Sequence, residues 1–114
     1  MKKFEIWLAN LDPAYGTEPG KIRPVIVVQA NALNSTNHPS TLILPITSKL
    51  KPGAFPLRIR IGKSETKLIE ESDIVIDQIR AIDNKRLVTK IDELPIQYHD
   101  MIDKALKYVL EIWE

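Results

Sequence analysis

Residues 16–28 read Gly16-Thr17-Glu18-Pro19-Gly20-Lys21-Ile22-Arg23-Pro24-Val25-Ile26-Val27-Val28, a polar Gly/Pro-rich loop that runs directly into an aliphatic strand. Consecutive apolar residues are typical of a strand at the centre of a sheet, where both faces are covered. Arg23 lies at the start of this strand, so the aliphatic part of its side chain is held while its guanidinium stays accessible. A guanidinium keeps its charge and offers a planar fork of donors to phosphate. The stretch therefore predicts a buried central strand with an anion-recognising side chain at its entrance.

Four more segments are predicted to be strands around this central one, Arg23–Gln29. They are Glu5–Leu11, Thr41–Ile46, Leu57–Ile61 and Asp73–Ile82. The Leu57–Ile61 segment alternates strictly between apolar residues and arginines, which is typical of a strand with one solvated face. Several short strands within about a hundred residues favour a small barrel or a strongly curved sheet.

The C-terminal segment changes its hydrophobic period from two to between three and four. Pro95 suits the first turn of a helix. One apolar stripe follows, made of Tyr98, Ile102, Ala105, Leu106, Val109 and Trp113. This spacing predicts an amphipathic helix of about 18 residues that covers the sheet. We expect one domain, residues 1–114, that is mainly β with a C-terminal helix.

Composition restricts the chemistry that the chain can perform. The sequence has no cysteine and only two histidines, so neither a thiol nucleophile nor a metal site is expected. No apolar run approaches the 18 residues of a membrane helix, and no secretion signal is recognisable. We therefore expect a cytoplasmic protein that requires no cofactor and has no membrane partner.

The charge is distributed unevenly, although the total is only +1. Residues 1–63 carry nine Lys/Arg and three Asp/Glu, whereas residues 64–114 carry seven Lys/Arg and twelve Asp/Glu. A basic half beside an acidic half favours a polyanionic ligand, and chance clustering on a solvated surface is the alternative.

Three motifs resemble those of the MazF/PemK toxins in order and spacing. The first is Gly16-x-Glu18 followed by Lys21-x-Arg23-Pro24. The second is Pro45-Ile46-Thr47-Ser48, and the third combines Asp77-Gln78-Ile79-Arg80-x-Ile82-Asp83 with Arg86-Leu87. Taken singly, each of these residues has a structural alternative to a functional role. Thr47 and Ser48 would then satisfy only loop backbone groups, and Asp77 and Arg80 would form only a structural ion pair. The resemblance extends over nearly the whole chain.

This resemblance implies an SH3-like β-barrel with appended helices, a homodimer, and a sequence-specific endoribonuclease of a toxin–antitoxin pair. It implies catalytic roles for Arg23 and Thr47. Glu18 would orient Arg23 or accept a proton, or would only be its ion-pair partner. The expected RNA-binding residues are Gly16, Thr17, Lys21, Ser48, Lys49, Lys51, Phe55, Asp77 and Gln78. The expected partners are single-stranded RNA and an antitoxin whose acidic tail crosses the RNA groove, with DNA contacted only through that antitoxin.

The chain departs from one branch of the family at two positions, and these departures restrict which mechanism the resemblance implies. One PemK-type branch has a histidine where this chain has Thr17, and an arginine where it has Val75. The Arg23/Thr47 pair of the MazF branch is therefore the better fit, with Asp77 a lesser candidate.

The residues favour cleavage in which the RNA 2′-OH attacks its own phosphate, leaving a 2′,3′-cyclic phosphate and a 5′-OH. The substrate then supplies the nucleophile, and the protein aligns it and stabilises charge. Arg23 suits charge stabilisation better than proton abstraction, because its pKa is above 12. Phe55, Tyr15 and Gln78 are candidates for base recognition, with burial in the core as the alternative for Phe55.

Two other functions remain open from the sequence. A CcdB-like toxin poisons DNA gyrase through its C-terminal tail, and the terminal Ile112-Trp113-Glu114 would suit such an anchor. A non-catalytic RNA-binding small barrel would bind RNA without forming products.

Overall fold

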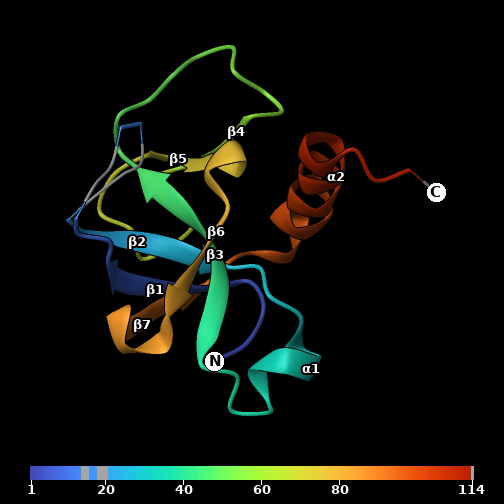
Figure 1. Ribbon diagram of the computed structural model, residues 1–114. Coiled ribbons are helices and arrows are strands. Elements are labelled where there is room, and N and C mark those ends of the chain that lie inside the picture. The colour runs from blue at the N-terminus through green and yellow to red at the C-terminus, as the bar shows by residue number, and fades with distance from the viewer. Residues whose placement is uncertain (14–15, 18–20, 114) are drawn as a thin grey trace.

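The computed structural model describes residues 1–13, 16–17 and 21–113 of the chain. These residues form seven strands, two α-helices and three short 3-10 helices (Figure 1). In chain order the elements are β1 (Glu5–Asn10), β2 (Ile22–Val27), α1 (Asn31–Asn34), β3 (Ser40–Thr47), β4 (Arg58–Ile61), β5 (Ser72–Val75), η1 (Ile76–Gln78), β6 (Arg80–Asp83), η2 (Asn84–Arg86), β7 (Leu87–Glu93), η3 (Ile96–Tyr98) and α2 (His99–Leu110). No helix in these ranges is long and apolar enough to cross a membrane.

The strands form one curved antiparallel sheet in the order β4-β5-β3-β2-β1-β7, with β6 also paired to β3. β3 carries the curvature because it changes partners along one edge. Its residues Ser40–Ile43 pair with β6, and Ile46 and Thr47 pair with β5. Within the described part of the chain the two end strands, β4 and β7, do not pair with each other. The predicted mainly β, barrel-like fold with a C-terminal helix is confirmed, with a sheet that curls without closing.

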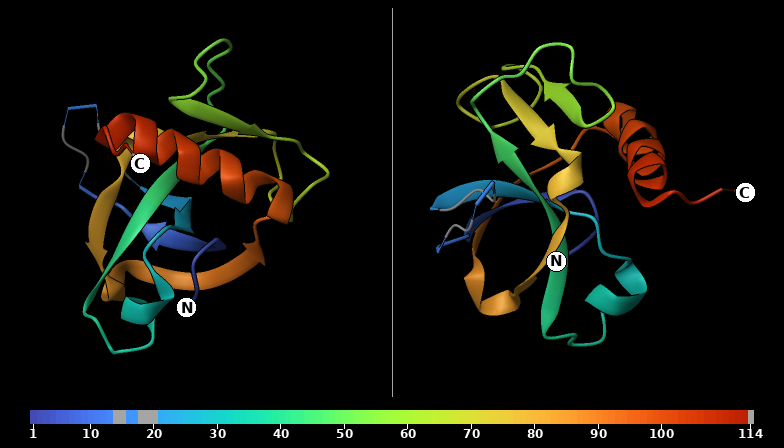
Figure 2. Two further views of the ribbon diagram at one scale, coloured as in Figure 1. Left: turned by 90° about the vertical axis from the view of Figure 1, so that its right-hand side faces the viewer. Right: turned by 45° about the horizontal axis from the view of Figure 1, so that its top comes forward.

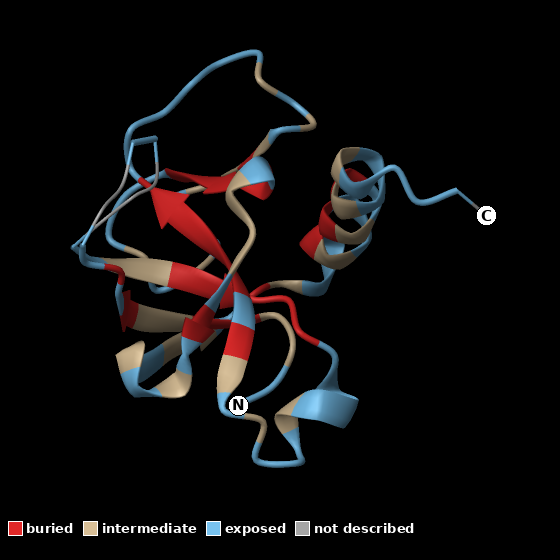
Figure 3. Ribbon diagram, viewed as in Figure 1, coloured by how far each residue is buried: buried red, intermediate tan, exposed pale blue. Residues whose placement is uncertain are grey.

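Aliphatic side chains fill the concave side of the sheet, and α2 lies across it (Figure 2). Ile26, Leu44 and Ile74 from three strands are fully buried there, together with Ile102 of α2. Figure 3 shows this burial concentrated in the central strands and in the connection that follows β2, while the long β3–β4 loop is largely exposed. The prediction that the aliphatic run after Arg23 forms a buried central strand is confirmed, since Val25, Ile26 and Val27 are inaccessible to solvent.

Contacts from the N-terminus fix α2 against the sheet. The rings of Phe4 and His99 stack with centroids 3.8 Å apart, and His99 Nε2 lies 2.9 Å from the Leu94 carbonyl oxygen. Lys3 Nζ donates to Asp103 at 3.0 Å. The half-buried ring of His99 is therefore part of the contact between the helix and the sheet.

Two predicted elements have different limits in the structure. The single strand expected over Asp73–Ile82 is divided into β5, η1 and β6, because the chain must cross from one end of β3 to the other. The predicted helix of about 18 residues is also too long. It ends at Leu110 with Glu111 in the left-handed region (φ 56°), and the Ile112 amide donates to the Lys107 carbonyl. Trp113 is consequently 74% exposed and does not belong to the buried stripe.

Candidate active site

Arg23 and Thr47 lie at adjacent ends of neighbouring strands. The antiparallel register of β2 and β3 pairs Val27 with Ile43 and Val25 with Pro45. Arg23 and Thr47 each lie two residues beyond this last pair, near the start of β2 and at the end of β3. Both side chains line a pocket of about 520 Å³ at the open end of these strands.

The pocket collects side chains from separate parts of the sequence. Its lining comprises Thr17, Arg23, Thr47, Lys49, Lys51, Ala54, Leu57, Arg58, Val75, Asp77 and Gln78. Among the described residues of this lining, four are cations and one is an acid. A concave, strongly cationic surface attracts a phosphodiester chain. The structure thus brings seven of the predicted site residues into one pocket.

The hydroxyl of Thr47 has a fixed orientation. Its Oγ1 accepts a hydrogen bond from the Lys49 amide at 3.1 Å, and the residue is only 9% exposed. This confirms the structural role considered for Thr47, in which the hydroxyl satisfies a loop backbone group. The bond occupies an acceptor position, so the hydroxyl proton remains available for donation to an oxygen bound in the pocket.

The buried carboxylate of Asp73 holds together one wall of the pocket. Its carboxylate is 1% exposed and accepts hydrogen bonds from the Lys51 amide at 2.8 Å and from Arg58 Nη1 at 3.2 Å. Arg58 Nη1 also donates to the Lys49 carbonyl at 2.8 Å, which ties its guanidinium to the β3–β4 loop. Asp73 therefore holds both a pocket cation and the loop that carries Lys49 and Lys51.

The pKa of Asp73 is shifted by opposing effects. Burial acts most strongly and raises it, but hydrogen bonds from Arg60, the Lys51 amide and Arg58 together lower the pKa below its ordinary value. Asp73 is thus a buried anion at neutral pH, compensated by two arginines. Neither Arg58 nor Asp73 was assigned to the site from the sequence. The two arginines on the solvated face of Leu57–Ile61 were the available signal, but sequence alone did not reveal which pocket that face borders.

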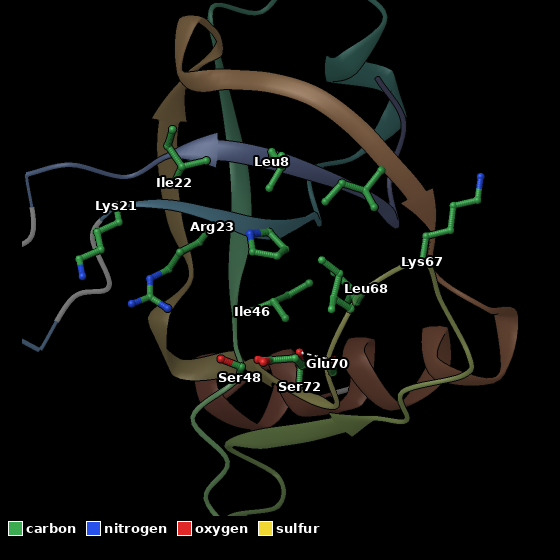
Figure 4. A pocket seen from close by; sticks show the side chains of 13 residues that line it. Leu8, Lys21, Ile22, Arg23, Ile46, Ser48, Lys67, Leu68, Glu70 and Ser72 are labelled. Atoms are coloured by element: carbon green, nitrogen blue, oxygen red, sulfur yellow. Dashed lines mark hydrogen bonds between the residues drawn. The ribbon is translucent and has the colours of Figure 1, made fainter.

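A second, more apolar pocket of about 560 Å³ lies on the other side of Arg23. Figure 4 shows Lys21 and Arg23 at one end and Lys67 at the other, with Ile46 and Leu68 between them. Ser48 also lines this pocket rather than the cationic one. Lys21 and Ser48 therefore share this second pocket with Arg23, whereas Thr47 lines the cationic one.

The other predicted site residues are placed differently. Phe55 is 68% exposed, so the alternative that it packs in the core is wrong. Gly16 is exposed and lines none of the pockets described here. Glu18 and Tyr15 lie outside the described residues. Asp77 and Arg80, both described, form no ion pair with each other. Asp77 is exposed at the pocket, whereas Arg80 is half-buried.

The described ends of the β1–β2 loop are anchored by Arg86. Its Nη1 donates to the Asn10 carbonyl at 3.0 Å and to the Asp12 carbonyl. The Lys21 amide donates to the Asp12 carboxylate, and the Leu11 amide to the Lys21 carbonyl. These bonds fix the point at which the chain enters β2 and so position Arg23. Within the described ranges, no three His, Cys, Asp or Glu side chains gather in a metal-binding arrangement.

Comparison with known proteins identifies the family. Residues 2–110 match the model of the PemK-like, MazF-like toxins of type II toxin–antitoxin systems. The chain belongs to this toxin family. The PemK/MazF-like toxin is also 31% identical over 112 residues to endoribonuclease EndoA of Bacillus subtilis, covering 98% of this chain and 96% of EndoA.

Solved structures share the fold of this PemK/MazF-like toxin. The toxin MazF-mt6 of Mycobacterium tuberculosis superposes with a TM-score of 0.80 at 17% identity, covering 96% of this chain and 99% of its own. An endoribonuclease in complex with its cognate antitoxin, from a Mycobacterial species, gives a TM-score of 0.79 at 19% identity. The match covers 100% of this chain and 99% of the endoribonuclease chain. At these identities the likeness concerns the fold.

Proposed function

We propose that this toxin is an endoribonuclease that cleaves single-stranded RNA in the Arg23–Thr47 pocket, through attack of the RNA 2′-OH. The observation that carries the proposal is that Arg23 and Thr47 line one pocket, whose described residues include four cations and one exposed acid. Family membership and the 31% identity to EndoA support the same activity. They also favour it over a gyrase poison, although Trp113 is exposed near the C-terminus.

The chemistry requires little covalent participation by the protein. A bond forms between the 2′-oxygen and phosphorus while the bond from phosphorus to the 5′-oxygen breaks, giving a 2′,3′-cyclic phosphate and a 5′-OH. One proton leaves the 2′-OH and one is gained by the 5′-oxygen. Arg23 would stabilise the charge that develops on the phosphorane, and the Thr47 hydroxyl would donate to a phosphate oxygen. Asp77 and Glu18 are the carboxylates proposed to accept the first proton.

Sequence preference would come from side chains around the reacting phosphate. Thr17 and Gln78 line the pocket and carry groups that hydrogen-bond to base edges. Single-stranded RNA exposes those edges, and its 2′-OH distinguishes it from DNA. Lys49 and Lys51 would hold the backbone through charge.

The direct experiment incubates the protein with a defined single-stranded RNA pool in EDTA and maps the ends of the products. We expect cleavage without added metal, at a limited set of sequences, with cyclic phosphate and 5′-OH ends. Products with 5′-phosphate and 3′-OH ends would contradict the proposed mechanism.

Thr47→Ala is expected to lower kcat/KM about tenfold to a hundredfold, because it removes one donor to the transition state. Thr47→Ser keeps the hydroxyl and should recover most of the rate. Single-turnover cleavage of one mapped RNA compares the variants, with circular dichroism as the control for folding. Equal losses in the alanine and serine variants would assign the defect to packing of the methyl group instead.

We further propose that the toxin works as a homodimer and that an antitoxin with an acidic tail covers the cationic pocket. The Mycobacterial endoribonuclease solved with its cognate antitoxin supports the second part. Contact with DNA would then occur only through the antitoxin. If RNA and antitoxin bound together without weakening each other, the shared-surface model would be wrong, whereas a monomer in sedimentation experiments would exclude the dimer.

A further inference from the structure

A third pocket lies beside the proposed catalytic pocket and shares a wall with it. Its volume is about 450 Å³, and its lining comprises Lys51, Pro52, Gly53, Ala54, Phe55, Arg58, Ile59, Arg60, Asp73 and Met101. Lys51, Ala54 and Arg58 line both pockets. The β3–β4 loop, drawn in green at the top of Figure 1, supplies most of this wall. A chain bound at Arg23 and Thr47 therefore has a continuous route into this neighbouring pocket.

Phe55 gives this pocket an exposed aromatic surface. The side chain is 68% exposed although phenylalanine is usually buried, and the pocket that it lines also contains three cations. An exposed aromatic ring in a cationic groove is the arrangement that proteins use to stack unpaired nucleobases.

The charges around Phe55 favour a polyanionic ligand over an apolar one. Residues 47–64 contain five Lys/Arg and no Asp/Glu. Arg60 Nε donates to the buried Asp73 carboxylate at 2.5 Å, and its Nη1 lies 4.0 Å from Glu71. Asp73 also lines the pocket and compensates part of the arginine charge, but it is only 1% exposed.

Asp73 also makes this surface rigid. It holds Arg58 and Arg60 from β4 and the Lys51 amide from the loop. Preset cations lose little conformational freedom when a phosphate binds between them. The same buried carboxylate therefore links the walls of the catalytic pocket and of its neighbour.

We propose that this third pocket is a nucleotide subsite for RNA, in which one base next to the cleaved step stacks on Phe55 while Lys51, Arg58 and Arg60 contact its phosphate. The inference rests on the proposed ribonuclease function and adds a determinant of substrate length. A protein partner is the competing occupant of this surface. It is disfavoured because the pocket that Phe55 lines also contains three cations, Lys51, Arg58 and Arg60.

The test uses RNA oligonucleotides centred on a mapped cleavage site and shortened one nucleotide at a time from each end. For the wild-type protein, removal of one flanking nucleotide should lower kcat/KM about tenfold, the effect of losing one stacked base. In Phe55→Ala this length dependence should disappear. Phe55→Trp should preserve it, and Phe55→Leu, which keeps apolar volume without an aromatic face, should not. Leu50→Ala is the matched control, since Leu50 lies exposed in the same loop and lines neither pocket.

The outcomes separate the subsite from the function on which it rests. Normal length dependence in Phe55→Ala would overturn the subsite and leave the ribonuclease assignment intact. Length dependence that persists in Phe55→Leu would overturn stacking on the aromatic ring, and an altered oligomeric state of Phe55→Ala in sedimentation experiments would assign the surface to protein contact. If the wild-type protein cleaved no RNA, the proposed function would fail and the subsite with it.

Discussion

Arg23→Ala is expected to reduce the rate of RNA cleavage about a thousandfold, the largest effect of any single substitution in the pocket. Arg23 lies in strand β2 and lines the same pocket as Thr47, so a phosphate bound there can meet both residues. Without its guanidinium, the extra negative charge of the phosphorane would face Lys49, Lys51 and an Arg58 that is already bonded to Asp73 and the Lys49 carbonyl. Single-turnover cleavage of a mapped RNA in EDTA measures the loss.

Arg23→Lys distinguishes charge from geometry. The lysine keeps the charge but not the planar pair of donors, so we expect it to recover only part of the rate. Lys85→Ala serves as the control for a lost surface cation, because Lys85 is exposed on η2 and lines none of the three pockets. Wild-type rates in a correctly folded Arg23→Ala protein would remove Arg23 from the mechanism.

Asp73→Asn is expected to cost about 2 kcal/mol of unfolding free energy. Loss of one member of a buried ion cluster typically costs more, but solvent partly screens the two arginines. Urea unfolding measures the change. Asp100→Asn is the matched control: its ion pair with Lys104 is exposed, so its loss should cost less than about 0.5 kcal/mol.

The effect of Asp73 should depend on pH in a defined direction. Hydrogen bonds from Arg60, Lys51 and Arg58 outweigh burial and hold the pKa of this carboxyl below its ordinary value of 3.8. Its contribution is therefore complete above about pH 5 and is lost as the pH falls through the lower folded-state pKa. The stability difference between wild type and Asp73→Asn should stay constant from neutral pH to about pH 5 and shrink below about pH 4. A difference that grows on acidification would show that Asp73 is not a stabilised anion.

The sequence predicted most of the sheet because its strands carry strong apolar patterns. The aliphatic run after Arg23 and the alternation of Leu57–Ile61 both correspond to strands. β7 was missed, since Val88, Thr89 and Lys90 are exposed and its pattern resembles a polar loop. The division of Asp73–Ile82 was hidden for the opposite reason: apolar residues continue through the 3-10 turn Ile76–Gln78, so local pattern gave no sign of the crossover.

The candidate site was only partly predictable. Motif order indicated Arg23, Thr47 and Asp77, and the fold places all three in one pocket. The roles of Arg58 and Asp73 depend on pairing between β4, β5 and the end of β3, which sets Arg60 opposite Asp73 and Asp73 opposite Thr47. Such a row across three strands is a property of register, and local sequence does not determine register between distant segments.

The most direct test of the account replaces a single oxygen of the substrate. An RNA oligonucleotide with a mapped cleavage site is made with one 2′-deoxynucleotide immediately 5′ of the reacting phosphate, and its cleavage is compared with that of the unmodified RNA. If the 2′-OH is the nucleophile, the modified site will bind but remain intact, because the attacking atom is missing. Cleavage of the 2′-deoxy site at a rate comparable to that of the unmodified site would contradict the mechanism proposed for the Arg23–Thr47 pocket.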